Sequence, residues 1–192
     1  MKKRRMNKQV LVTLFLAFIM VFSTFAVIFD RYTNVVKLKY NGHSFSQNGN
    51  LFATKINGNN VYFDNFPKNV EDINLSSDIV SRISNTKMLY ITYDISQDTR
   101  KIMGKTQYDL QNALWQNFKI YAAASLMNES SYNLPVVSCR NATASVPVME
   151  LSYSNETGAS LEGNCIFVYS TNEAELIRLK DRLLFGLFGI IK

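Results

Sequence analysis

The longest apolar run of the chain lies near its N-terminus, from Val10 to Phe29, and contains no charge, proline or glycine. About 20 apolar residues in a helix cover the roughly 30 Å hydrocarbon core of a bilayer. A secretory signal usually has a shorter apolar centre, about 7–15 residues, and a small-x-small cleavage site. Thr24-Phe25-Ala26 is a weak example of such a site. We therefore expect an uncut transmembrane helix over residues 10–29, with a cleaved signal or a buried core helix as alternatives.

Short runs with partial polar–apolar alternation follow this span, and Asn-Gly pairs separate them. The runs are Val35–Tyr40, Ser44–Gln47, Leu51–Ile56 and Val61–Phe63, and the pairs are Asn41-Gly42, Asn48-Gly49 and Asn57-Gly58. Both residues of an Asn-Gly pair tolerate positive φ, which tight hairpin turns require. The pattern predicts a small antiparallel meander within residues 30–66, and binding loops are the less favoured interpretation.

Residues 67–170 mix helical and strand patterns. Pro67 opens a helical stretch that reaches Ser84, with a break near residues 74–77. Met88–Tyr93 is a continuous apolar run, typical of a strand covered on both faces. The best soluble helix is predicted over Gln107–Leu126, which carries one apolar face. Three further strands are predicted at Pro135–Ser138, Val146–Tyr153 and Ser160–Tyr169.

The C-terminal segment predicts a helix that starts at Thr171 as N-cap. Its apolar stripe is formed by Leu176, Leu179, Leu183, Leu187 and Ile190, and is widened by neighbours up to Ile191. We expect this helix to cover a sheet, and an interfacial helix on a membrane or partner is the alternative.

The predicted fold class is therefore α+β or mixed α/β. A transmembrane helix precedes a meander and a layered α/β unit over residues 67–192, which has a mixed sheet and a C-terminal covering helix. Few prolines and no Ser/Gly-rich linker separate the two parts, so one continuous domain over residues 30–192 is favoured.

The chain has a formal charge of +6, but the excess is confined to its N-terminus. Five basic residues precede the span, and the rest holds 16 basic and 15 acidic residues. This argues against a nucleic-acid partner. By the positive-inside rule, residues 1–9 are expected to be a cytoplasmic tail and residues 30–192 to be extracytoplasmic. The lipid bilayer is then the first expected partner.

An exported domain meets oxidising surroundings, so Cys139 and Cys165, the two cysteines of the chain, are expected to form a disulfide. Buried reduced thiols are the alternative. A metal site is not expected, because structural zinc needs about four ligands and His43 is the sole histidine. His43 is placed in a surface turn beside Gly42.

Four Asn-x-Ser/Thr triplets lie after the span and are candidate glycosylation sites in an exported protein. They begin at Asn74, Asn128, Asn141 and Asn155.

Motifs that carry common chemistries are missing from the sequence. It has no G-x-G-x-x-G, Walker loop, G-x-S-x-G or C-x-x-C pattern, so no cofactor is expected and the catalytic residues stay unknown. Asp94 is the one candidate ligand site, because it follows an apolar strand where α/β folds bind ligands. Asp98 can supply a second carboxylate. Asp94-Ile95-Ser96 also fits a simple turn.

Several segments resemble small single-span surface proteins of small-genome archaea. They are Tyr40-Asn41-Gly42-His43-Ser44-Phe45, Cys139-Arg140-Asn141-Ala142-Thr143, Gly163-Asn164-Cys165-Ile166, Asp181-Arg182-Leu183-Leu184 and Leu187-Phe188-Gly189-Ile190. The resemblance covers most of the exported part and implies an anchored surface location. It implies no activity and no catalytic residue.

These features favour a membrane-anchored, disulfide-stapled domain that binds or scaffolds other components of the cell envelope. A pilin-like surface subunit is a second hypothesis, although Asn7-Lys8-Gln9 lacks the Gly or Ala cleavage position and the acidic residue of that pattern. A third hypothesis is a cation-dependent envelope hydrolase or transferase that uses Asp94. Absence of catalytic motifs makes a non-enzymatic role the favoured one.

Overall fold

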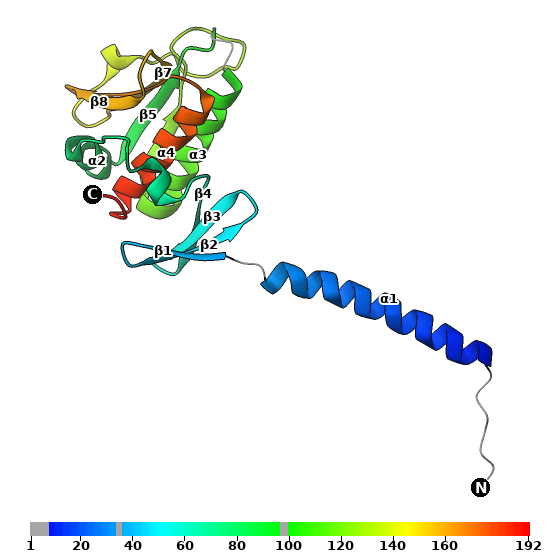
Figure 1. Ribbon diagram of the computed structural model, residues 1–192. Helices are drawn as coiled ribbons and strands as arrows, with labels where there is room; N and C mark the ends of the chain where they lie inside the picture. Colours follow the sequence, from blue (N-terminus) through cyan, green and yellow to red (C-terminus); the bar gives the residue numbers. More distant parts are fainter. Residues whose placement is uncertain (1–7, 34–35, 97–99) are drawn as a thin grey trace.

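The computed structural model describes residues 8–33, 36–96 and 100–192, apart from the side chains of residues 27–33 and Arg100. Helix α1, Lys8–Thr33, projects away from the globular part (Figure 1). Within it, Lys8–Ala26 is long and apolar enough to cross a membrane, and none of that stretch is buried against the rest of the chain. The prediction of an N-terminal helix that is long and apolar enough to span a membrane is therefore confirmed.

The expected meander is present as a four-stranded antiparallel sheet in the order β1-β2-β3-β4. Its strands are β1 Val36–Tyr40, β2 His43–Asn48, β3 Leu51–Ile56 and β4 Asn59–Phe63. The first and third turns have the two positive φ angles of a type I′ turn, at Asn41-Gly42 and Asn57-Gly58. The second turn is Gly49-Asn50 and not Asn48-Gly49, because Asn48 pairs with Leu51. His43 is the first residue of β2, so the expectation that it lies in a surface turn is wrong.

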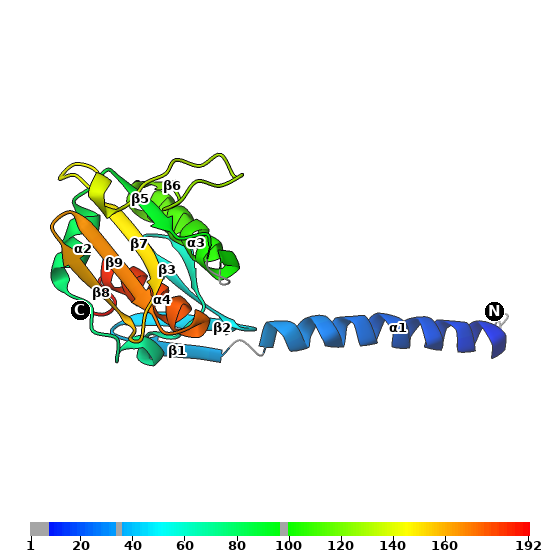
Figure 2. The ribbon, with the colours of Figure 1, turned by 90° about the horizontal axis from the view of Figure 1, so that it is seen from above.

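A second, five-stranded mixed sheet has the order β6-β5-β7-β9-β8, with β8 as its antiparallel edge strand (Figure 2). Its strands are β5 Met88–Tyr93, β6 Tyr121–Ala124, β7 Val148–Tyr153, β8 Gly158–Glu162 and β9 Cys165–Ser170. The helices are η1 Pro67–Val70, α2 Ser77–Ser84, α3 Arg100–Phe118, η2 Cys139–Asn141 and α4 Glu173–Leu187. Helix α4 packs on the sheet beside α3, so the α+β class and the covering helix are confirmed.

The predicted helix over Gln107–Leu126 is wrong in both bounds, because it merges a helix with a strand. Helix α3 begins at Arg100 and ends at Phe118, where Lys119 adopts φ +58°. The amide of Lys119 donates to the carbonyl of Trp115, which is the single bond of an αL cap, and the amide of Ile120 donates to the carbonyl of Leu114. Tyr121–Ala124 pairs with β5 as a parallel strand. Its three alanines favour a helix locally, and pairing with β5 overrides that preference.

Two strand predictions also change. Pro135–Ser138 forms only one isolated bridge, between Leu126 and Val136. The run Ser160–Tyr169 is divided into β8 and β9 by a turn at Gly163-Asn164, where Gly163 has φ +59°. The core-facing positions are Ala159 and Leu161 in β8 but Ile166 and Val168 in β9, so the turn shifts the phase of the period-two pattern.

Helix α4 is capped one residue later than predicted and ends earlier. The side chain of Asn172, not Thr171, accepts a hydrogen bond from the amide of Glu175. The helix ends at Leu187 because Gly189 adopts φ +68° and the amide of Ile190 bonds to the carbonyl of Phe185. The last apolar residues therefore turn back onto the core instead of extending the helix.

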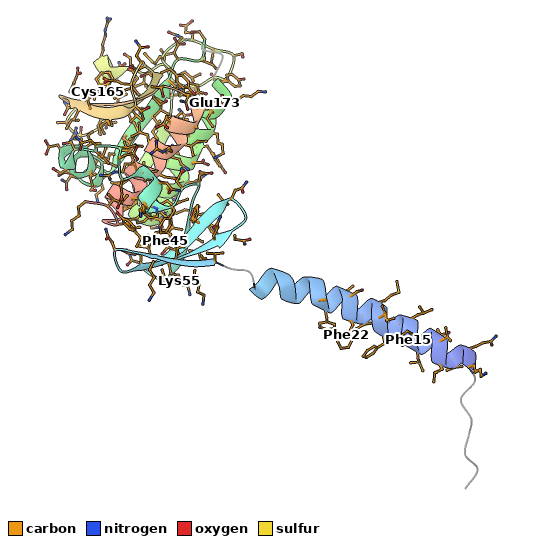
Figure 3. All side chains as sticks on the ribbon, viewed as in Figure 1. Phe15, Phe22, Phe45, Lys55, Cys165 and Glu173 are labelled. Atoms are coloured by element: carbon orange, nitrogen blue, oxygen red, sulfur yellow. A yellow bond between two sulfur atoms is a disulfide. The ribbon has the colours of Figure 1, made fainter. Side chains whose placement is uncertain are left out.

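One hydrophobic core joins the meander to the α/β unit. Phe45 of β2 and Phe63 of β4 both pack against Phe185 of α4, and the rings of Phe63 and Phe185 stack with centroids 4.3 Å apart. Figure 3 places Phe45 on the core side of the meander and Lys55 on its opposite side. The meander is thus one layer of the globular part, and its outer face is left open.

Candidate functional site: a groove between a strand edge and a helix

A groove of about 420 Å³ lies where β4 faces α3, and α4 forms its floor. Its walls combine polar and apolar side chains from segments that are far apart in sequence. They are Leu51, Asn60, Val61, Tyr62, Phe63, Asp64, Lys105, Asp109, Asn112, Ala113, Gln116, Asn117, Lys180 and Leu184. A concave site with a few convergent polar groups is the form that binding sites commonly take.

The first wall is the free edge of β4, the last strand in the order β1-β2-β3-β4. Ile56 pairs with Asn59 across a two-residue turn, and Thr54 pairs with Val61. In an antiparallel ladder, hydrogen-bonded pairs alternate with pairs whose backbone groups point the other way. Asn60 and Tyr62 therefore direct their N–H and C=O groups away from β3. Among the residues that the structure describes, no backbone partner meets these groups.

The opposite wall is one stripe of α3. Lys105, Asp109, Asn112 and Gln116 recur three to four residues apart, so they share one side of the helix, and Asn117 lies next to Gln116 at its end. Lys105 pairs with Asp109 at 2.6 Å along the helix. The amide side chains carry both hydrogen-bond donors and acceptors. If an extended polypeptide lies along β4, these side chains can therefore form hydrogen bonds with its backbone groups that point away from β4.

The floor holds a cluster of buried charges centred on Lys180 of α4. The side chain of Lys180 is only 5% exposed and Asp181 is fully buried. The Nζ atom of Lys180 lies 2.5 Å from Asp64, 3.1 Å from Asp181 Oδ1 and 3.9 Å from Asp109. The other oxygen of Asp181 accepts hydrogen bonds from the backbone and side-chain amides of Asn65. The cluster joins α4 to the end of β4.

The pKa values of this cluster are set by burial and by pairing. Burial alone would lower the pKa of Lys180, but the carboxylates of Asp181 and Asp64 outweigh it and raise that pKa. Burial raises the pKa of Asp181, and Lys180 and Asn65 offset only part of the effect. For Asp64, burial is outweighed by the hydrogen bond and charge of Lys180, so its pKa is lowered. Lys180 is therefore held as a cation.

Sequence reasoning missed this cluster, although one signal was available. Lys180 lies four residues after Leu176 and three before Leu183, so the helical period places it inside the apolar stripe of α4. A charge on the buried side of a helix needs a partner, because desolvation of an unpaired charge is costly. That partner, Asp64, is 116 residues away in sequence and belongs to another layer.

Asp94, the candidate ligand site from sequence, serves as a turn residue. It follows β5 as expected, and its Oδ1 accepts hydrogen bonds from the amide and hydroxyl of Ser96 and from the side-chain amide of Asn128. These bonds, led by the Ser96 hydroxyl, lower the pKa of Asp94. Asp98 lies outside the described residues, so the expected pairing of its carboxylate with Asp94 stays a prediction.

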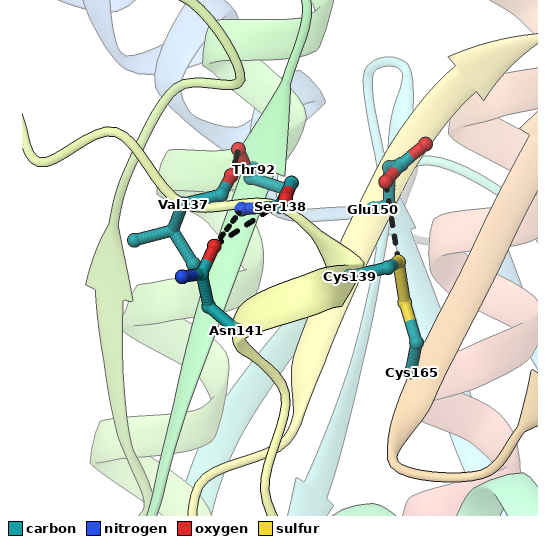
Figure 4. Close-up of a disulfide and its surroundings, with 7 residues drawn as sticks. All are labelled: Thr92, Val137, Ser138, Cys139, Asn141, Glu150 and Cys165. Atoms are coloured by element: carbon teal, nitrogen blue, oxygen red, sulfur yellow. Dashed lines mark hydrogen bonds between the residues drawn. A yellow bond between two sulfur atoms is a disulfide. The ribbon is translucent and has the colours of Figure 1, made fainter.

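The predicted disulfide between Cys139 and Cys165 is present, with Cα atoms 5.3 Å apart (Figure 4). It ties η2 to the first residue of β9. Nearby, Thr92 of β5 donates a hydrogen bond to the carbonyl of Val137 at 2.8 Å. The loop after β6 is thus held against the sheet face opposite α4 at two points.

The carboxylate of Glu150 lies 3.2 Å from the sulfur of Cys139. Burial raises the pKa of Glu150, and a backbone hydrogen bond from Cys139 offsets part of this. Together with Cys165 these residues have the spacing of metal ligands. Metals bind the thiolate, however, and both sulfurs are used in the disulfide.

The four candidate glycosylation residues, Asn74, Asn128, Asn141 and Asn155, are all exposed. Two of them already use their side chains locally. Asn128 donates to Asp94, and the side-chain oxygen of Asn141 accepts from the amide of Ser138. A glycan on Asn128 would attach at the nitrogen that bonds to Asp94.

The groove has the chemistry of a recognition site for an extended chain, with backbone groups on one side and amide side chains on the other. No protein-family model matches the chain, and no curated protein or solved structure matches it either.

Proposed function

We propose that this chain is a membrane-anchored binding protein whose groove captures an extended polypeptide segment by strand addition. The observation that carries the proposal is the free edge of β4, where the backbone N–H and C=O groups of Asn60 and Tyr62 point towards a polar stripe of α3. Edge strands bind peptides in this way because main-chain hydrogen bonds supply affinity, and alternate side chains supply specificity. The five residues of β4 span about 16 Å, which is enough for a short peptide strand.

The polar lining of the groove supports a peptide ligand over a purely apolar one. A strand added to β4 leaves every second N–H and C=O group pointing away from β4, towards α3. Buried groups of this kind need partners. Asn112, Gln116 and Asn117 offer donors and acceptors at that position. Close to the floor, the Lys105–Asp109 pair and Asp64 can meet charged side chains of the peptide.

The proposed location is the outer face of a cell membrane, with helix α1 as the anchor. The basic residues of the N-terminal tail favour a cytoplasmic start. The disulfide Cys139–Cys165 is typical of an oxidising compartment. A binding or scaffolding component of the cell envelope fits both features, and it agrees with the resemblance to archaeal single-span surface proteins.

A proline at position 62 tests strand addition directly. Proline is tolerated on an edge strand where its missing N–H would face outwards. Tyr62→Pro should therefore keep the fold but remove one donor from the groove and obstruct an added strand. We expect peptides selected from a random display library on the full chain in nanodiscs to bind the variant roughly tenfold more weakly or worse.

Tyr62→Ala is the matched control, because it removes the same exposed ring and keeps the N–H. We expect it to bind the selected peptides within a few-fold of the native chain. Equal affinities of the proline and alanine variants would show that the edge of β4 takes no part in binding. Failure of any peptide to be enriched would exclude the groove as a peptide site.

A further inference from the structure

The outer face of the meander carries positive charge, and no other described part of the chain covers it. Residues that alternate with the buried ones point to this face, and most of them are exposed. They are Lys37, Lys39, Ser44, Ser46, Asn48, Leu51, Ala53, Lys55, Asn60 and Tyr62. The set contains three lysines and no acidic residue. Figure 3 shows Lys55 on the side of the sheet that faces away from the core.

This face is also held close to the proposed anchor. Only two residues separate the end of α1 at Thr33 from the start of β1 at Val36. The four helical steps from Phe29 to Thr33 rise about 6 Å. The next three residues add at most about 11 Å when fully extended. Strand β1 therefore starts no more than roughly 17 Å from the end of the apolar run.

The lipid head-group layer occupies part of this distance. It is about 5–8 Å thick on each side of the hydrocarbon core. The meander thus starts within roughly 12 Å of the head groups, and lysine side chains extend towards them. This distance is comparable with the screening length of about 8–10 Å at physiological ionic strength. The charges of the outer face and of anionic lipids are close enough to attract one another.

We propose that the outer face of the meander is a docking surface for anionic lipid head groups of the bilayer that holds α1. Lys37, Lys39 and Lys55 supply the attraction. Tyr62 is 58% exposed and Leu51 is 42% exposed, and both are suited to the interface between water and lipid. Docking fixes the globular part against the membrane and sets the height of the β4–α3 groove above it. The inference rests on α1 as the membrane anchor, and Leu51 and Tyr62 belong both to this face and to the rim of the groove.

Residue-resolved labelling of the full chain in nanodiscs tests this inference. Lysines are labelled with an amine reagent and tyrosines by hydroxyl radicals, and rates are read by peptide mass spectrometry in zwitterionic and in anionic lipids. Each lysine near an anionic surface favours the docked state by about fivefold. We therefore expect Lys37, Lys39, Lys55 and Tyr62 to react at least about fivefold more slowly in anionic nanodiscs. About 0.5 M salt, which shortens the screening length to roughly 4 Å, should reverse this protection.

Two triple variants separate charge from general crowding. Lys37→Gln, Lys39→Gln and Lys55→Gln together should remove the protection of Tyr62. The matched control neutralises three exposed lysines outside the meander, Lys87, Lys101 and Lys119, and should leave Tyr62 protected. Equal rates in both lipids, or equal protection in both, would overturn the inference. Failure of the chain to stay in the nanodisc would instead count against α1 as the anchor.

Discussion

Replacing Lys180 by methionine is expected to destabilise the globular part by about 3–5 kcal/mol at neutral pH. The reason is that Asp181, which is fully buried, would lose the cation that lies 3.1 Å away. Removal of one partner of a buried ion pair leaves an uncompensated charge, and this costs about 3–5 kcal/mol. Pulse proteolysis across a urea series, on the full chain in nanodiscs, measures the free energy of unfolding.

Lys105→Met is the matched control on the same groove. Its side chain is 52% exposed and pairs with Asp109 one helical turn away. Exposed pairs of this kind contribute roughly 0.3–0.5 kcal/mol. Similar losses of stability in the two lysine variants would contradict a stabilising role of the buried cluster. A Lys180→Met variant as stable as the native chain would contradict it as well.

The pH dependence of the Lys180→Met variant follows from Asp181. The folded-state pKa of Asp181 is raised above its ordinary value, so stability is lost as pH rises through that raised pKa. Without Lys180 the pKa rises further. At a pH near 4, about the ordinary value for Asp, the carboxyl of the variant is protonated in the folded state. The difference in the free energy of unfolding between the native chain and Lys180→Met should therefore become smaller as pH falls from 7 towards 4.

Removing the disulfide has the second large expected effect. Cys139 and Cys165 are 26 residues apart, and closing a loop of this length stabilises a fold by about 3–4 kcal/mol in the chain-entropy model. The link also holds the loop after β6 against the sheet, where Val137 packs in a small apolar cluster with Cys165. We expect the variant with Cys139→Ala and Cys165→Ala to unfold at lower urea concentration. Its free energy of unfolding should be smaller than that of the native chain by about this amount.

A reductant distinguishes the cross-link from local packing. Reduced native protein should approach the stability of the double alanine variant, and the variant itself should not respond to the reductant. If the reductant destabilised both proteins equally, the effect would lie elsewhere. If native and variant chains were equally stable, the disulfide would make no contribution to the fold.

Sequence patterns were sufficient where structure is decided locally. The apolar run at the N-terminus, two of the three Asn-Gly turns and strand β5 all follow from short-range periodicity and turn chemistry. The disulfide follows from two cysteines in a chain with an export pattern. In each case a few adjacent residues, or one compositional fact, contain the necessary information.

The sequence-based predictions are wrong where contacts between residues far apart in sequence determine the local structure. Tyr121–Ala124 becomes a strand because β5 offers an edge, and no neighbouring residue signals this. Lys119 closes α3 with a positive φ that glycine usually supplies. The groove forms only where β4, α3 and α4 lie side by side in the folded chain. Lys180 of α4 forms its ion pair with Asp64, which follows β4, at this place. Local patterns do not encode such pairings.

Backbone amide hydrogen exchange of β4, resolved by residue, tests the proposed groove most directly. In the free chain we expect the amides of Val61 and Phe63 to be protected by β3, while those of Asn60 and Tyr62 exchange freely. A selected peptide should then slow exchange at Asn60 and Tyr62 and leave Val61 and Phe63 nearly unchanged. A bound peptide that left Asn60 and Tyr62 exchanging as fast as before would contradict strand addition at this edge.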